Sequence, residues 1–193
     1  MLIMIYKMYL MRLIDIFLSL FGLICTFPVL LILVIFCFFD TGAPIFRQKR
    51  LGKNQRPFML IKFRTMRENT ASVPTHLVSS DAITAFGRFL RRTKLDELPQ
   101  LWNVLRGEMS FVGPRPGLPN QDSLTKARSI EGVYSVKPGI TGLAQIMGID
   151  MSTPELLART DAQMIAEMSV MNYSRFIFLT LIGNGRGDRI KLK

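Results

Sequence analysis

Two adjacent carboxylates stand just before a proline, in a part of the chain that is otherwise rich in basic residues. Asp96 and Glu97 belong to the stretch "LDELPQLWNVLRGEMSFVGPRP", which covers residues 95–116 and ends in Pro-Arg-Pro. A carboxylate among cations can attack a phosphorus atom or hold a metal ion, while the cations bind phosphate groups. The same two residues can also simply cap a helix, because Asp is among the commonest N-cap residues. The pair therefore predicts either phosphate chemistry or an ordinary helix start.

Three groups of basic residues accompany this pair in the sequence. They are, in chain order, Lys62, Arg64 and Arg67, then Arg88, Arg91, Arg92 and Lys94, and finally Arg115 between two prolines. Few acids among many cations is the pattern that phosphate chemistry requires. Each arginine taken alone is typical of a solvated surface charge, so the prediction depends on their convergence in space.

The acidic pair is expected at the start of a short helix. Pro99 suits a first helical turn, the following apolar residues fall on one face, and Gly107 is a typical helix end. Leu98 precedes the proline, so we expect extended backbone there. The carboxylates would then lie beside the free N–H groups of a helix N-terminus, where anions are favoured.

The remaining sequence predicts an α/β chain that is mostly helical, with one small β-hairpin. Residues 44–62 place apolar stretches on both sides of a turn that contains Gly, Asn and Pro, which is typical of a hairpin. Residues 68–80 are polar and predict a surface loop, and residues 83–92 predict a short helix. A helix is expected from residue 154 to about 173, and the apolar residues 174–182 either lie on a membrane surface or pack in the core.

Composition favours an anionic, membrane-associated partner. The chain has 25 basic and 14 acidic residues, a net charge of +11 and a hydrophobic fraction of 49%. Because the apolar residues gather at the N-terminus, a membrane is a better partner than nucleic acid. Cys25 and Cys37 lie inside the apolar run and His76 is the only histidine, which excludes a zinc site and fits a reducing compartment.

The apolar N-terminal segment has one charge near its start and a proline near its middle. It extends from Leu13 to Phe39, 27 residues, with Asp15 and Pro28 inside it. A straight helix of this length reaches about 40 Å, longer than a bilayer core of about 30 Å. Proline bends a helix, and both flanks are basic, which suits a helix that dips into the membrane and returns. A kinked spanning helix is equally compatible with the residues alone. A signal peptide is not expected, because the apolar part is long and no small-residue cleavage site follows it.

Four motifs in order resemble a known family. They are "PIFRQKRLGKNQRPF", "KFRTM", "LDELPQLWNVLRGEMSFVGPRP" and "KPGITGLAQ", and they cover most of the chain. In these motifs the chain resembles the bacterial sugar transferases, the monotopic polyprenyl-phosphate phosphoglycosyl transferases in their minimal single-domain form. The resemblance implies a membrane-inserted re-entrant helix in residues 1–40 and a cytoplasmic catalytic domain with membrane-surface amphipathic helices in residues 41–193. It also implies a stand-alone catalytic unit.

The resemblance implies a definite reaction. A UDP-sugar, commonly one with an N-acetylated amino sugar, would give its sugar phosphate to undecaprenyl phosphate and release UMP. This would occur at the cytoplasmic face of the bacterial inner membrane, as the first step of a surface glycan such as O-antigen, capsule, exopolysaccharide or a glycoprotein glycan. Nucleic acid is not an expected partner, and the oligomeric state is not indicated.

The resemblance also implies roles for single residues. Asp96 would attack the donor's β-phosphate and carry the sugar phosphate covalently, and Glu97 would help it to hold Mg²⁺. Substrate and phosphate binding would fall to Lys62, Arg64, Arg91, Arg115, Thr141 and Gln145.

The family favours the re-entrant helix, with one departure. Members often carry Ser-Pro at the bend, where the serine satisfies backbone groups freed by proline. This chain has Phe27-Pro28, so we expect Thr26 to take the part of the serine.

Two other functions are compatible with parts of the sequence. A membrane-tethered module that binds anionic lipid or a partner predicts that Asp96→Asn leaves function intact. A nucleic-acid binder leaves both the apolar segment and the acidic pair unexplained.

Overall fold

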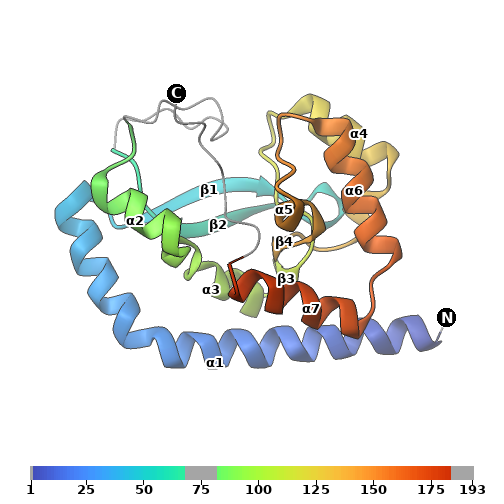
Figure 1. Ribbon diagram of the computed structural model, residues 1–193, viewed down its shortest axis with the longest axis horizontal. Helices are drawn as coiled ribbons and strands as arrows, with labels where there is room; N and C mark the ends of the chain where they lie inside the picture. Colours follow the sequence, from blue (N-terminus) through green and yellow to red (C-terminus); the bar gives the residue numbers. More distant parts are fainter. Residues whose placement is uncertain (1, 68–81, 184–193) are drawn as a thin grey trace.

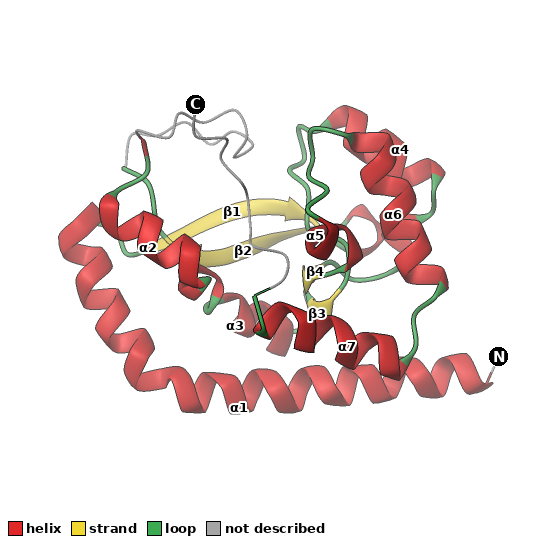
Figure 2. Cartoon of the chain, viewed as in Figure 1, coloured by secondary structure: helices red, strands yellow, loops and turns green. Residues whose placement is uncertain are grey.

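The computed structural model describes residues 2–67 and 82–183. The described chain is mostly helical, with two small two-stranded sheets above one long N-terminal helix (Figures 1 and 2). This confirms the mostly helical architecture with a small hairpin. The predicted polar loop at residues 68–80, with His76, lies outside the described residues.

The N-terminal helix α1 (Leu2–Thr41) is one element with Pro28 inside it. Figure 1 shows it bent into a long first arm and a shorter second arm. Among the described residues, α1 is the one helix long and apolar enough to cross a membrane. The expected division of the chain after residue 40 coincides closely with its end and stays a prediction.

Both arms of α1 are held on the same globular part of the chain. In the first arm, the Arg12 guanidinium donates to the carbonyls of Val104 (2.7 Å) and Leu105 (2.8 Å). At the end of the second arm, the Thr84 hydroxyl donates to Asp40 at 2.6 Å. The two ends of the apolar segment therefore share one docking partner.

The first arm also brings a buried carboxylate into the domain. Asp15 is 3% exposed. Its Oδ1 accepts from the Phe111 amide (3.0 Å), the Ser110 hydroxyl (3.1 Å) and the hydroxyl of Tyr173. These three donors belong to residues 110–111 and to Tyr173. Asp15 therefore joins α1 to two segments of the domain that are far apart in the sequence.

The expected role of Thr26 at the bend is wrong. Its hydroxyl donates to the carbonyl of Gly22, one turn back, at 2.6 Å. Pro28 leaves a different carbonyl without its usual amide partner, that of Ile24 four residues earlier. Thr26 therefore binds the turn before the one that the proline disrupts.

The predicted hairpin is confirmed. Strands β1 (Ile45–Leu51) and β2 (Pro57–Phe63) pair antiparallel along their whole length. The turn between them is the 3₁₀ helix η1 (Lys53–Gln55), in which Asn54 and Gln55 have positive φ. Asn tolerates this left-handed conformation better than most residues, which fits its place in the turn.

The helix predicted at residues 83–92 is α2 (Ala85–Thr93), capped by Thr84, whose hydroxyl accepts from the Gly87 amide at 2.8 Å. The helix lies directly against the backbone after β2. A Cβ on Gly87 would come within 2.2 Å of the Thr65 carbonyl oxygen. Only glycine therefore allows this close approach.

The acidic pair follows α2 in the short 3₁₀ helix η4 (Leu95–Glu97), and α3 (Gln100–Leu105) comes next. Leu98 is helical, with φ −52° and ψ −39°, so the expectation of extended backbone before the proline is wrong. The preference of pre-proline residues is a bias, and here the chain turns continuously from η4 into α3. Gly107 ends the turn after α3 with a φ of +79°, as expected.

The second sheet is a parallel pair that the sequence did not predict. Strands β3 (Ser110–Val112) and β4 (Gly139–Thr141) pair in register, and the chain between them forms α4 (Asp122–Ile130) and the 3₁₀ helix η5 (Val133–Ser135). Each strand has three residues, too few to show an alternating pattern. The helix α5 (Leu143–Met147) follows β4 directly.

The long helix predicted from residue 154 to about 173 is wrong, because two helices are present. They are α6 (Pro154–Ala166) and α7 (Val170–Leu181). Ser169 separates them, since its hydroxyl accepts from the Asn172 amide at 3.1 Å and so starts a new helix. Along α7, Tyr173 is buried while Phe178 and Leu181 are exposed, so this helix has one core side and one open side.

Candidate active site

Most of the predicted site residues line one cleft. Its volume is about 790 Å³, and its walls come from β2, α2, η4, α3, β3, the Pro-Arg-Pro turn, β4, α5 and α7. The predicted residues in its lining are Lys62, Arg91, Asp96, Glu97, Arg115, Thr141 and Gln145. The basic groups that are separate in sequence therefore converge on the acidic pair.

Asp96 is the buried member of the pair, at 7% exposed. Burial, and next the charge of Glu97, raise the pKa of Asp96 from its ordinary 3.8 to about 6. The charges of Lys62, Arg91 and Arg115 act in the opposite direction and favour the carboxylate. Asp96 is therefore largely ionised at pH 7 and poorly solvated, as a nucleophile should be.

Glu97 faces a different neighbour. One oxygen of Glu97 lies 3.4 Å from a guanidinium nitrogen of Arg115, and both side chains are partly buried. The ion pair links η4 to the Pro-Arg-Pro turn across the cleft.

Arg91 is held in place by a residue just after β2. Its Nε donates to the hydroxyl of Thr65 at 2.8 Å, and Thr65 is itself buried. The close packing of Gly87 on the Thr65 carbonyl brings α2 near enough for this bond. Thr65 was not among the predicted residues, although it lies in the motif "KFRTM".

Arg64 lies apart from the cleft. Its Nε donates to the Ala43 carbonyl at 2.9 Å, and its guanidinium lies over the Phe46 ring, 5.5 Å from the ring centre. These contacts join the end of β2 to the start of the hairpin. Its phosphate-binding role stays a prediction, one that this location does not support.

Thr141 and Gln145 form the opposite wall. The Thr141 hydroxyl lies 2.5 Å from the hydroxyl of Thr180 on α7. The Gln145 Nε2 is 3.5 Å from the Ile140 carbonyl, and its Oε1 is buried without a hydrogen-bond partner in the described chain. Thr180, which also lines the cleft, was missed by sequence reasoning because its role depends on a contact between distant elements.

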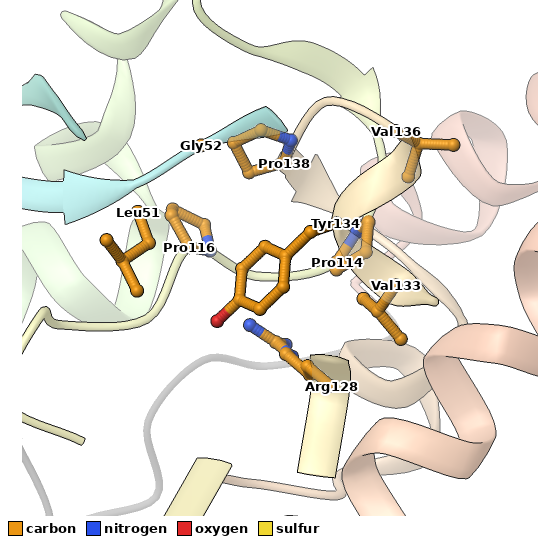
Figure 3. A pocket seen from close by; sticks show the side chains of 9 residues that line it. All are labelled: Leu51, Gly52, Pro114, Pro116, Arg128, Val133, Tyr134, Val136 and Pro138. Atoms are coloured by element: carbon orange, nitrogen blue, oxygen red, sulfur yellow. The ribbon is translucent and has the colours of Figure 1, made fainter. Parts of the chain in front are cut away.

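The turn that carries Arg115 is supported from behind by a buried ion pair. The Arg128 guanidinium donates to Asp161 at 2.7 and 3.1 Å and to the carbonyl of Arg115 at 2.7 Å. Arg128 and Asp161 are 2% and 1% exposed. Figure 3 shows Arg128 beside the ring of Tyr134, in a small cavity between Pro114 and Pro116. Neither member of the pair was predicted.

The second arm of α1 packs behind the acidic turn. Leu33 and Cys37 of α1 form a buried cluster with Phe63 and Leu90, and Leu95 and Leu98 of the turn region pack against it. The apolar helix α1 therefore supports the turn that carries Asp96 and Glu97.

The carboxylates suit a cation that brings other ligands with it. Across residues 2–67 and 82–183, no group of three or more His, Cys, Asp and Glu side chains could hold a metal ion. Mg²⁺ is commonly bound by one or two carboxylates together with substrate phosphates. Asp96 and Glu97 fit this requirement at the side of a cationic cleft.

Comparisons with known proteins identify the family of the chain. A profile of the bacterial sugar transferase family matches residues 6–184. The chain is 36% identical to a UDP-galactose-lipid carrier transferase of Erwinia amylovora, over 80% of this chain and 36% of that protein. It is 46% identical to a UDP-glucose:undecaprenyl-phosphate glucose-1-phosphate transferase of Caulobacter vibrioides, over 56% of this chain and 42% of that protein.

A third relative is closer in length. The chain is 42% identical to the uncharacterized sugar transferase EpsL of Bacillus subtilis, over 73% of this chain and 70% of that protein. By contrast, the chain spans 36% and 42% of the two relatives with named substrates.

Proposed function

The chain belongs to the bacterial sugar transferase family, and on this premise we propose that it transfers a sugar 1-phosphate from a UDP-sugar to undecaprenyl phosphate. UMP is the second product. Relatives named for UDP-sugar donors and for undecaprenyl phosphate support this assignment. The product would start the assembly of a surface glycan.

The reaction proceeds in two displacements at phosphorus. A carboxylate oxygen of Asp96 attacks the β-phosphorus of the donor, the bond from that phosphorus to the UMP oxygen breaks, and UMP leaves. A phosphate oxygen of undecaprenyl phosphate then attacks the same phosphorus, and the bond to Asp96 breaks. The carboxylate is restored and undecaprenyl-diphosphate sugar departs, which predicts ping-pong kinetics.

The observation that supports this mechanism best is the setting of Asp96. Its carboxylate is buried, and the charges of Lys62, Arg91 and Arg115 favour its ionised form. An anion that attacks a diphosphate meets electrostatic repulsion, and positioned cations offset it.

Mg²⁺ would be held by Asp96 and Glu97 together with donor phosphates, and it would neutralise negative charge as UMP leaves. We expect chelation with EDTA to abolish UMP release and Mg²⁺ to restore it.

The apolar N-terminal helix would dip into the inner membrane from the cytoplasmic face and return. Both of its arms contact the same domain, through Arg12 near one end and Asp40 at the other. A helix that crossed the bilayer would place these two ends on opposite sides. Exposed apolar side chains on α7 and α3, Phe178 and Trp102 among them, would rest at the membrane surface.

The donor sugar is proposed to be an N-acetylated amino sugar. Because two relatives are named for UDP-galactose and UDP-glucose, these hexose donors must be compared with UDP-linked amino sugars. The decisive assay incubates the detergent-solubilised protein with undecaprenyl phosphate, Mg²⁺ and each UDP-sugar in turn, and measures UMP.

Asp96→Asn tests the chemistry itself. We expect it to abolish UMP release with the best donor, whereas Asp122→Asn, at an exposed carboxylate on α4, keeps normal activity. With donor alone, the wild-type peptide that contains Asp96 should gain the mass of the sugar phosphate. Product formation by Asp96→Asn would contradict the mechanism, whereas absence of UMP release by the unaltered protein with every UDP-sugar would favour a membrane-tethered binding module.

A further inference from the structure

The cleft has an apolar wall in addition to its charged one. Leu98 and Leu101 line it on the α3 side, and Ile177 and Leu181 line it on α7. A nucleotide sugar is polar over most of its length and gains little from such a wall. The polar donor therefore does not explain why one wall of the cleft is apolar.

This wall continues to the surface beside the membrane helix. Both α3 and α7 pack on α1, and Figure 1 shows the end of α7 and α3 just above it. At this border Leu181 is 79% exposed, and Phe178, Ile182 and Trp102 are exposed as well. The cleft therefore opens, through apolar side chains, toward the most apolar part of the molecule.

The two parts of the cleft together fit a ligand with an anionic head and a long apolar tail. Lys62, Arg91 and Arg115 complement a phosphate, and the α3–α7 wall complements a hydrocarbon chain. The acceptor of the proposed reaction has this composition, whereas the donor does not.

We propose that the isoprenoid chain of the acceptor leaves the cleft between α3 and α7, with Leu101 on one side and Leu181 on the other. Its phosphate then points at Asp96 while the rest of the chain remains in the bilayer. This inference rests on the proposed function and adds to it the residues that hold the acceptor.

A polar contact holds the α7 side of this groove in place. The hydroxyls of Thr180 and Thr141 lie 2.5 Å apart and hold α7 against β4. Thr180 directly precedes Leu181, so the bond also sets the position of the apolar wall. The α7 wall of the groove is therefore held by the domain itself.

The kinetic test compares two exposed apolar residues. Leu181→Ser should raise the KM for undecaprenyl phosphate about tenfold, because the variant removes apolar contact with the chain. Release of UMP from donor alone is measured in parallel, and an effect on the acceptor KM that exceeds the effect on this step assigns the loss to acceptor binding. The control is Ile130→Ser on α4, which is 76% exposed and lies outside the cleft lining.

A short acceptor sharpens this test. Geranyl phosphate has too few isoprene units to extend along the whole groove, so Leu181→Ser should reduce the preference for undecaprenyl over geranyl phosphate. Equal acceptor KM values for Leu181→Ser and Ile130→Ser, with an unchanged preference for chain length, would overturn the proposal.

A second measurement needs no turnover. A photoreactive residue in place of Leu181, and in a matched protein in place of Ile130, is irradiated in nanodiscs that contain undecaprenyl phosphate. Lipid attached at position 181 and not at 130 supports the groove, and equal or absent attachment at 181 overturns it. Attachment at 181 in a protein that releases no UMP from any UDP-sugar would retain the groove and reject the proposed function.

Discussion

At the scale of single residues, the proposed mechanism makes the ionisation of Asp96 set the pH dependence of the first chemical step. Attack requires the carboxylate, and burial and the Glu97 charge raise the pKa of Asp96 to about 6. The rate of UMP release from donor alone should therefore be level above about pH 7 and fall as the pH drops through 6. The measurement is single-turnover UMP release between pH 5 and 8, without the lipid phosphate.

Glu97→Gln provides the internal check on that profile. Removal of the neighbouring negative charge should lower the pKa of Asp96, so the falling limb should move to lower pH even though the rate itself is reduced. A limb that stays in place in this variant would assign the titration to another group.

A second residue-scale prediction concerns the support of Arg115. Arg128→Lys keeps the charge but cannot reproduce three hydrogen bonds, two to Asp161 and one to the Arg115 carbonyl. We expect the donor step to slow about fivefold to tenfold, by misplacement of Arg115. The effects of Arg128→Lys and Arg115→Lys should then be less than additive in the double variant, since both act through one side chain.

The matched control for that variant is Arg159→Lys. Arg159 lies on α6 and forms an exposed ion pair with Glu131 at 3.9 Å, so Arg159→Lys should leave the donor step unchanged. Strict additivity of the two active-site changes would mean that Arg128 does not act through Arg115.

At the scale of elements, the docking of α1 depends on Asp15. Its carboxylate accepts from Phe111, Ser110 and the buried Tyr173, so Asp15→Ala removes the acceptor that these three donors share. We expect a loss of about 2–4 kcal/mol in the free energy of unfolding. Denaturant unfolding in detergent measures it, with the exposed Asp122→Ala as control. An unchanged midpoint would mean that the first arm of α1 is held by Arg12 and apolar packing without help from Asp15.

The sequence predicted elements well wherever the signal was local. The hairpin at residues 45–63 has apolar strands around a turn with Asn54, and α3 has Pro99 before it and Gly107 after it. The pair β3 and β4 escaped prediction because three-residue strands carry no pattern and pair with a distant segment. The break at Ser169 was missed because apolar periodicity continues through it and only the cap reveals the new helix.

The site residues, too, were predicted where the signal was local and missed where it was not. Asp96, Glu97 and Arg115 were predicted because they share one motif, and the structure places them in one cleft. Thr180 and Arg128 were missed because they act on residues 39 and 33 positions away in the chain, namely Thr141 and Asp161. Sequence spacing contains no record of such tertiary contacts.

At the scale of the whole molecule, the arrangement of α1 predicts one-sided exposure. Lys7 precedes the segment held by Arg12, and Gln55 lies at the exposed tip of the hairpin. Cysteines introduced by Lys7→Cys and Gln55→Cys should both resist an impermeant thiol reagent in intact cells and both react after lysis. The unaltered protein gives the background from Cys25 and Cys37. Labelling of one position and not the other in intact cells would mean that α1 crosses the membrane.

The position of Trp102 has a practical consequence. It is the only tryptophan of the chain and is exposed on α3, close to where that helix packs on α1. Intrinsic fluorescence therefore reports from a single point, beside the proposed lipid boundary. Transfer from detergent to vesicles with brominated acyl chains should quench this emission, whereas soluble iodide should barely affect it. The depth of the enzyme in a bilayer is thus readable without any added dye.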